Sequence, residues 1–423
     1  MIVIDLENGD LLPQPQRFAL DEEVTHGTGR IVELVRTGGD RALVELTATH
    51  DGADLSDGVD VPRERWMEAA ARIPSQLRAA LESMAGRLRE LHARQLPKPW
   101  SSRAPGYVHG EIVRPVASVG CYVPGGRAAY PSSVLMTAIP ARVAGVPRVV
   151  VATPPAANGT VADAVLCAAL VADVDAVYRV GGAQAVAALA YGTESIPSVD
   201  MVVGPGNMWV TAAKKELAGI VGIDGLNGPS ELVVVADATG DPAVLAVDLV
   251  AQAEHDPLAR TTLVALDRGL FEGVDRALAD EIEGSPRRAI VEQAIQATQA
   301  VIAPDEEAAA AVVDRLAPEH LEIVTQDPES FLARVRSFGA AFLGATSPVS
   351  LGDYGVGSNH VLPTMGTARF SSGLRSSDFI TVSSYVRADP EGLASLGPEV
   401  ETLAQAEGLA GHARASEIRR TRR

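Results

Sequence analysis

The sequence predicts an α/β protein with at least two parallel sheets. Short runs rich in β-branched residues, such as 148–151 and 200–203, each precede a turn and then a helical stretch. Further runs of this kind are 232–235, 262–265 and 321–324. Continuous apolar strands that alternate with helices are typical of parallel sheets covered on both faces. Two series of such units follow one another along the chain and separate near residues 225–235.

The remaining segments predict the elements around these sheets. Residues 1–100 are mainly helical in pattern, with apolar residues three and four positions apart. Residues 111–123 are richer in Val and Ile and predict a strand. Asp241 and Pro242 predict a helix start, since Asp caps free N–H groups and Pro fits the first helical position. Residues 388–412 are acidic and helical in pattern, which predicts an appended arm.

Composition excludes several classes of function. The 423 residues carry 54 acidic and 36 basic side chains, a net charge of −18, so a long polyanion such as nucleic acid would be repelled. Two cysteines, Cys121 and Cys167, cannot build a disulfide framework and favour reduced thiols in the cytoplasm. No uncharged apolar stretch of about 18 residues predicts a membrane span, and the acidic N-terminus does not resemble a signal peptide.

Glycine-rich turns are the first candidate binding segments. The usual Gly-x-Gly-x-x-Gly dinucleotide pattern follows none of the predicted strands. The segment 204–207, Gly-Pro-Gly-Asn, lies between a strand and a helix, where backbone N–H groups could bind a phosphate. Taken alone, a tight turn explains it better, and the same holds for 181–184.

Several polar side chains are candidates for chemistry. Gln252 and His255 are three apart at a predicted helix end, so they share one face, although a histidine there also simply favours the helix C-terminus. Glu319 and His320 follow the helix predicted over 306–316, where they suit general acid–base work or merely cap the helix.

The segment 352–360 most clearly favours a function, since three glycines, Asp353, Tyr354 and His360 share one loop. Glu407 and His412 by themselves are typical of an exposed helix. His255, Asp353 and His412 carry the nitrogen and oxygen ligands that suit Zn²⁺, but their spacing alone does not establish a metal site.

Together these segments resemble the histidinol dehydrogenase family, over nearly the whole chain from about residue 20. The matching segments are 120–127, 130–134, 181–185, 204–207, 228–231, 251–256, 317–322, 353–360 and 407–412. Many ordered motifs that agree at once are far more specific than any one of them.

The resemblance implies an architecture. It implies two Rossmann-like, nucleotide-binding-like domains, the second inserted in the first, with N- and C-terminal helical arms that embrace a partner subunit in a homodimer. The expected boundaries are 1–19 for the N-terminal arm, 20–120 with 235–373 for the first domain, 121–234 for the second, NAD-binding domain, and 374–423 for the C-terminal dimerisation arm.

The resemblance also implies site residues. One Zn²⁺ per subunit would be held by Gln252, His255, Asp353 and His412. Glu319 and His320 would be the catalytic acid–base pair. Substrate would be held by Ser230, His320, His360 and Glu407 together with the zinc ligands, and NAD by Tyr122, Gln184 and Asn207. The implied reaction oxidises L-histidinol to L-histidine through histidinaldehyde with two NAD⁺, the last step of histidine biosynthesis.

The sequence departs from the family pattern at Thr137, Asn227, Gly355 and 375–384, while every position expected to be catalytic or to bind zinc matches. Two alternatives therefore stay open. One is a related NAD-dependent dehydrogenase that oxidises another small primary alcohol, such as an amino alcohol or a sulfonated diol. The other is a non-catalytic binding protein on the same scaffold, which has no need of the Glu319–His320 pair and the zinc ligands together.

Overall fold

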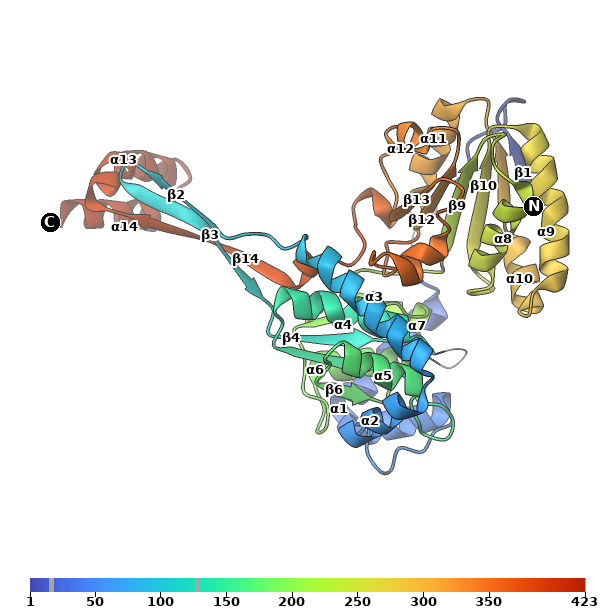
Figure 1. Ribbon diagram of the computed structural model, residues 1–423. Coiled ribbons are helices and arrows are strands. Elements are labelled where there is room, and N and C mark those ends of the chain that lie inside the picture. Colours follow the sequence, from blue (N-terminus) through green and yellow to red (C-terminus); the bar gives the residue numbers. More distant parts are fainter. Residues whose placement is uncertain (15–18, 126–128, 423) are drawn as a thin grey trace. The chain divides into compact units, whose positions relative to one another are not determined.

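The computed structural model describes residues 1–14, 19–125 and 129–422. The chain divides into two compact units. The main body comprises Met1–Gln95 and Ala117–Asp378, and the arm comprises Leu96–Val116 and Phe379–Arg423 (Figure 1). Part of the expected N-terminal arm lies outside the described residues. So do Gly126 and Arg127 of the segment 120–127.

The main body contains a five-stranded parallel sheet in the order β6-β5-β4-β7-β8. Its strands are β4 (Ser118–Tyr122), β5 (Arg148–Ala152), β6 (Ala176–Tyr178), β7 (Met201–Val203) and β8 (Gly222–Ile223). The helices between them are α4 (Pro131–Ala144), α5 (Asp163–Val171), α6 (Gly182–Tyr191) and α7 (Met208–Leu217). The central strands are buried on both faces, which explains their unbroken apolar runs.

Three N-terminal helices cover this five-stranded sheet. They are α1 (Glu22–His50), α2 (Arg63–Arg72) and α3 (Ser75–Ala93), and they contact α6 and α7, α5, and α4 respectively. The expected grouping of 20–120 with 235–373 is therefore wrong for these helices. The reason is the apolar stripe of α1, whose Val32 and Leu43 share one core with Leu189 of α6.

A second, six-stranded parallel sheet has the order β1-β11-β10-β9-β12-β13. Its strands are β1 (Ile2–Asp5), β9 (Glu231–Ala236), β10 (Arg260–Ala265), β11 (Gln299–Ile302), β12 (His320–Val324) and β13 (Ala340–Leu343). Its helices are α8 (Pro242–Ala253), α9 (Arg268–Gly284), α10 (Arg288–Ile295), α11 (Glu306–Leu316) and α12 (Pro328–Leu332).

The order of these strands along the chain confirms one predicted feature and corrects another. All strands of the five-stranded sheet lie between β1 and β9, so one α/β domain is inserted in the other, as expected. Residues 1–19 were expected to form an arm, but Ile2–Asp5 form an edge strand paired with β11. The run Ile2-Val3-Ile4 supplies the β-branched residues that such a strand favours.

The arm combines a sheet with helices. The antiparallel strands β2 (Trp100–Ala104), β3 (Tyr107–Pro115) and β14 (Ile380–Ala388) precede α13 (Pro390–Ala406) and α14 (Ala410–Thr421). The arm was expected to be helical and to start at residue 374, yet it begins at Phe379 and takes in 96–116 as well. The strand predicted over 111–123 is likewise two strands, β3 in the arm and β4 in the main body.

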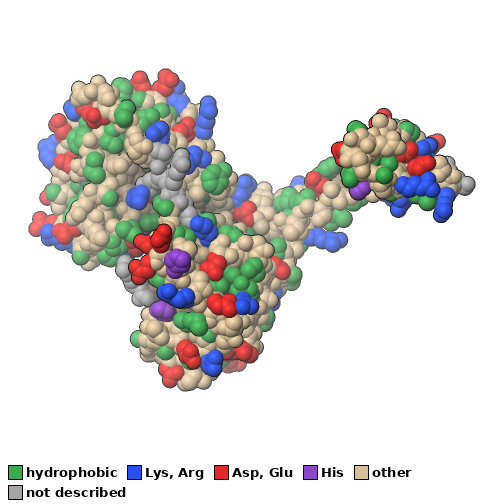
Figure 2. Space-filling model, turned by 180° about the vertical axis from the view of Figure 1, so that it is seen from behind, with side chains coloured by type: hydrophobic (Ala, Val, Ile, Leu, Met, Phe, Trp, Pro, Cys, Tyr) green, Lys and Arg blue, Asp and Glu red, His purple; other side chains and the backbone are tan. Residues whose placement is uncertain are grey.

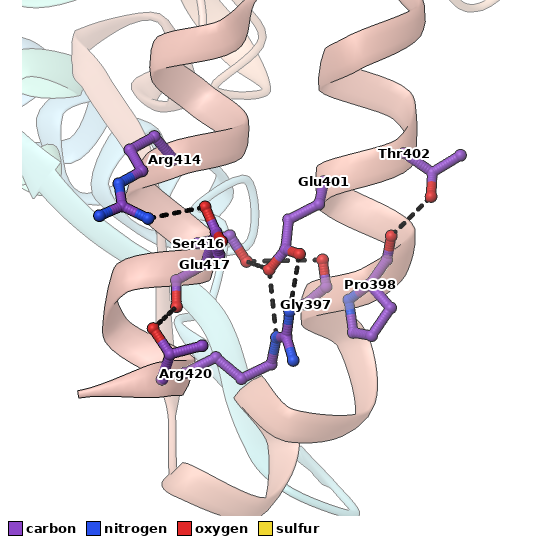
Figure 3. Close-up of polar contacts among 9 residues, drawn as sticks. Gly397, Pro398, Glu401, Thr402, Arg414, Ser416, Glu417 and Arg420 are labelled. Carbon is purple, nitrogen blue, oxygen red and sulfur yellow. Dashed lines mark hydrogen bonds and ion pairs between the residues drawn. The ribbon is translucent and has the colours of Figure 1, made fainter. Parts of the chain in front are cut away.

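A partly buried ion pair joins the two helices of the arm. The Glu401 carboxylate on α13 accepts hydrogen bonds from Nη2 of Arg420 at 2.8 Å and from Oγ of Ser416 at 3.1 Å, both on α14 (Figure 3). Gly397 allows the close approach, because a Cβ there would lie 3.1 Å from the Arg420 side chain. The two helices therefore pack as one helical hairpin.

Charged side chains of both signs lie on the surface of the molecule. On the face seen in Figure 2, Lys and Arg side chains are interspersed with Asp and Glu side chains. Within the described ranges, no helix is long and apolar enough to cross a membrane.

Candidate active site

The candidate site is a cavity of about 490 Å³ in the main body, with walls from both sheets. From the five-stranded sheet, Pro124 and Asn207 follow the carboxyl ends of β4 and β7. The strand order reverses between these two strands, and ligands of open α/β sheets bind at such a reversal. From the six-stranded sheet, Ser230 and Glu319 come from the amino ends of β9 and β12.

Glu319 and His320 meet here because the chain is irregular between α11 and β12. Ala317 ends α11 in the left-handed region, with φ of 48°. Gly339 packs against the next turn, and a Cβ there would lie 2.5 Å from the Glu319 carbonyl oxygen. This break lets both side chains enter the cavity, although neighbouring residues of a regular element face different ways.

The main-chain N–H and C=O of Glu231 hold both members of the pair. Its N–H donates to Oε2 of Glu319 at 2.8 Å, and its C=O accepts from Nδ1 of His320 at 3.0 Å. Because Nδ1 carries the proton in that bond, Nε2 of the neutral ring is the free acceptor. Nε2 is buried and has no hydrogen-bond partner among the described residues, so it is available to a substrate hydroxyl.

Burial sets the protonation of the pair. It lowers the pKa of His320 to about 4, below the ordinary value of about 6.5, so the ring is neutral at pH 7. Burial also raises the pKa of Glu319 well above its ordinary value, and the charges of Glu231 and Asp353 raise it further. Perturbed groups of this kind gather at catalytic sites.

Gln252, His255 and Asp353 also line the cavity, and their side chains carry oxygen and nitrogen donors of the kind that a divalent cation takes. The Gln252 amide is buried, and its Nε2 has no partner within the described ranges. Burial lowers the pKa of His255, which leaves a neutral imidazole able to bind a metal, and raises that of Asp353 to about 6. An amide, an imidazole and a carboxylate are a donor set that Zn²⁺ accepts.

The local folds behind these ligands differ from expectation. The helix α8 begins at Pro242 as predicted, with Asp241 accepting from the N–H of Ala243 at 2.9 Å, but it ends at Ala253, so His255 lies just beyond it. Asp353 lies on a single π-helical turn, Leu351–Gly355, a form common at functional sites. Within the described residues, no group of three or more His, Cys, Asp or Glu forms a metal site.

His360 enters the cavity beside these groups. Its Nδ1 lies 3.9 Å from Oδ1 of Asp353, and burial lowers its pKa to about 4. Its Nε2 lies 3.0 Å from Oγ of Ser133 on α4, so this contact joins residues of the two domains. Sequence analysis gave Ser133 no role. Its position in the motif 130–134 was the available signal.

The three residues expected to bind NAD lie at the carboxyl edge of the five-stranded sheet, but only Asn207 lines the cavity. Its Oδ1 caps α7 by accepting from the N–H groups of Trp209 and Val210. Tyr122 is buried at the end of β4, and its hydroxyl accepts from the N–H of Gly182 at 3.1 Å. Gln184 is buried two residues later, in the first turn of α6.

Glu407 and His412 belong to the arm. Glu407 caps the C-terminus of α13, and His412 is an exposed residue in the first turn of α14. The cavity of the main body therefore gathers, of the residues expected at the site, Ser230, Gln252, His255, Glu319, His320, Asp353, His360 and Asn207.

A cavity between two parallel sheets, lined by a buried carboxyl and a buried imidazole from neighbouring residues, is typical of an α/β enzyme that acts on a small molecule. The family model for histidinol dehydrogenase matches residues 16–420. The chain belongs to the histidinol dehydrogenase family and is an oxidoreductase.

Relatives and a solved structure agree with this assignment. Histidinol dehydrogenase of Methanothermobacter thermautotrophicus is 47% identical over 401 residues, which cover 94% of each chain. Histidinol dehydrogenase of Cereibacter sphaeroides is 50% identical over 90% of this chain and 88% of that protein. The crystal structure of histidinol dehydrogenase from Elizabethkingia anophelis matches with a TM-score of 0.92 and 32% identity, over 99% of this chain and 98% of that one.

Proposed function

We propose that this protein performs the zinc-dependent, NAD-linked, four-electron oxidation of L-histidinol to L-histidine through histidinaldehyde, the last step of histidine biosynthesis. The observation that carries the proposal is the buried Glu319–His320 pair in one cavity with Gln252, His255 and Asp353, in a chain of this family. We expect it to act in the cytoplasm and without nucleic acid.

In the first half of the reaction, His320 acts as the general base. Its unpartnered Nε2 accepts the proton of the substrate hydroxyl, while Nδ1–H stays on the carbonyl of Glu231. The lowered pKa makes the ring a weaker base than a free histidine, so it releases the proton readily after each transfer. Asn207, at the turn after β7, would contact NAD⁺, which would supply the hydride acceptor when bound.

The second half needs a water molecule added to the aldehyde. Glu319 in its ionised form removes a proton from that water, while the N–H of Glu231 keeps the carboxylate in place. Because the pKa of Glu319 is raised, the ionised fraction and the rate of this half should grow as pH rises.

Gln252, His255 and Asp353 would hold Zn²⁺, with His412 of the partner subunit as the fourth ligand in a homodimer. The ion, when bound, orients the imidazole and amine of the substrate. Ser230, His360 and Glu407 would contact the same substrate, and Tyr122 and Gln184 would support the NAD-binding edge.

A substrate panel tests the proposed function. The zinc-loaded enzyme should form NADH with histidinol at a rate at least about 100-fold higher, as kcat/KM, than with alcohols that lack an imidazole, because their binding leaves buried polar groups unpaired. Asn227 favours keeping the alternative substrates in the panel, since this departure from the family pattern lines the cavity whereas the buried Thr137 does not. Faster turnover of an amino alcohol or a sulfonated diol would favour the related dehydrogenase.

The metal ligands allow a separate prediction. His255→Ala and Asp353→Asn should lose bound zinc and lower the activity by more than about 100-fold. Mutation of a residue that only hydrogen-bonds to a metal ligand lowers metal affinity or activity by up to about 100-fold, and loss of a ligand itself should cost more. Elemental analysis of the purified variants measures the zinc, and circular dichroism checks the fold. The control is His50→Ala, an exposed residue at the end of α1, which should keep the metal. Full zinc retention in both ligand variants would refute the assignment.

A further inference from the structure

Glu231 is the first residue of β9 and is buried, with 6% of its surface exposed. Its main chain contacts both catalytic residues, as described above. Its side chain points to a third partner: Oε1 accepts a hydrogen bond from the N–H of Met365 at 3.0 Å. A single residue thus joins Glu319, His320 and the turn around Met365.

The turn around Met365 is held in an unfavourable conformation. Met365 has φ of 56°, in the left-handed region that a non-glycine residue rarely adopts, so its surroundings must hold it there. The Glu231 carboxylate is one such restraint, since it fixes the N–H of Met365. The turn and the strand entrance therefore support each other.

A second bond fastens the same two segments three residues earlier. The N–H of Gly228 donates to Oγ1 of Thr364 at 2.6 Å. Close packing accompanies it, because a Cβ at Gly228 would lie 2.6 Å from Cγ of Met365. Two cavity-lining residues belong to these hydrogen-bonded segments. Ser230 lies between Gly228 and Glu231, and Thr364 is itself the partner of Gly228.

We propose that Glu231 is a positioning residue: its side chain, anchored on Met365, holds the main-chain N–H and C=O of the same residue where they orient Glu319 and His320. The inference rests on the proposed function, in that these two residues perform the chemistry. Loss of the anchor would let the backbone at Glu231 shift, and the orientation of both catalytic side chains would shift with it.

Electrostatics support the same arrangement. Burial raises the pKa of Glu231 to about 7, and the N–H of Met365 is the leading opposing influence, so that bond favours the carboxylate. Burial of a charge is costly without such a partner. A buried carboxyl that served packing alone would be replaceable by an apolar side chain.

The test compares two substitutions of Glu231. Glu231→Leu removes the acceptor, whereas Glu231→Gln keeps an oxygen for the Met365 N–H. In the zinc-loaded holoenzyme, Glu231→Leu should lower kcat about 10- to 100-fold with KM for histidinol within about threefold, since small misplacements of catalytic groups have effects of this size. Glu231→Gln should restore kcat to within about threefold of wild type.

The control is a similar fastening at the opposite end of the same strands. Asp237 follows β9, and its carboxylate accepts from the N–H groups of Thr239 at 2.9 Å and Gln326 at 2.8 Å. Asp237→Ala should lower Tm but leave kcat unchanged. If Asp237→Ala and Glu231→Leu have similar Tm and lose kcat equally, the loss reflects reduced stability rather than the position of the catalytic groups. That result would overturn the proposal.

A third variant and an assay of the wild type complete the test. If Glu231→Leu does not fold, Glu231→Asp withdraws the acceptor by one methylene and should show the same loss of kcat. Unchanged kcat in a folded variant without the acceptor overturns the proposal. The wild type is assayed first: if it does not oxidise histidinol, the proposed function fails by itself, and Glu231 is then judged with the alcohol that the wild type does oxidise.

Discussion

Glu319→Gln should nearly abolish the oxidation of histidinaldehyde while sparing the oxidation of histidinol to the aldehyde. The Gln side chain still offers an oxygen to the N–H of Glu231, which now holds Glu319 at 2.8 Å, so the geometry should survive. The variant lacks the carboxylate that, in the proposed mechanism, activates water. General-base catalysis contributes about 10²–10⁴-fold, and the aldehyde half should fall by that factor.

Single-turnover measurements of NADH formation, started from histidinol or from histidinaldehyde, separate the two halves. The matched control is Glu322→Gln on β12, three residues after Glu319. Burial raises the pKa of Glu322 to about 9, so this carboxyl is protonated at neutral pH and an amide resembles it. The control should leave both halves within about threefold of wild type, since it removes no base. Equal losses in both halves of Glu319→Gln would mean that the division of roles is wrong.

Two inactive variants, His255→Ala and His412→Ala, should restore activity to each other when their subunits mix. His255 lies in the main body and His412 in the arm, and the proposed homodimer takes one from each chain for every site. A mixed dimer then has one site with both defects and one intact site. With random pairing of equal amounts, roughly a quarter of all sites are intact.

Co-expression, or unfolding and refolding of the mixture, followed by an NADH assay measures this recovery. The control mixes His255→Ala with Asp353→Asn. Both ligands line the cavity of one main body, so no mixed dimer of this kind has an intact site. If subunits demonstrably exchange and the first mixture stays inactive, His412 serves its own chain and the shared site is wrong.

Local patterns predicted most of the sheets and helices. The β-branched runs at 148–151 and 321–324 are strands, and the helix predicted over 306–316 is α11. Such patterns report burial within one segment. They do not report which sheet a helix covers, and this is why α1, packed on α6 and α7, was assigned to the wrong domain.

The candidate site also has features that the sequence predicted and features that it did not. Side-chain type and the family resemblance indicated His320 and Asp353, which the fold brings to one cavity. The hydrogen bonds that hold Glu319 and His320 were not predicted, because they use the main-chain N–H and C=O of Glu231, and nearly every residue carries these groups. The π-helical turn at Asp353 also escaped, since it follows from packing rather than from any repeat in the sequence.

The pairing of β1 with β11 has a consequence for biosynthesis. Ile2 pairs with Gln299, whereas the five-stranded sheet draws all its strands from residues 118–223. Domains generally fold as units while the ribosome extends the chain. The inserted domain is thus complete first, and β1 must wait, unpaired, until β11 has been translated. Until then, the unpaired N–H and C=O groups of this strand can pair with another chain, which makes it a point of premature association.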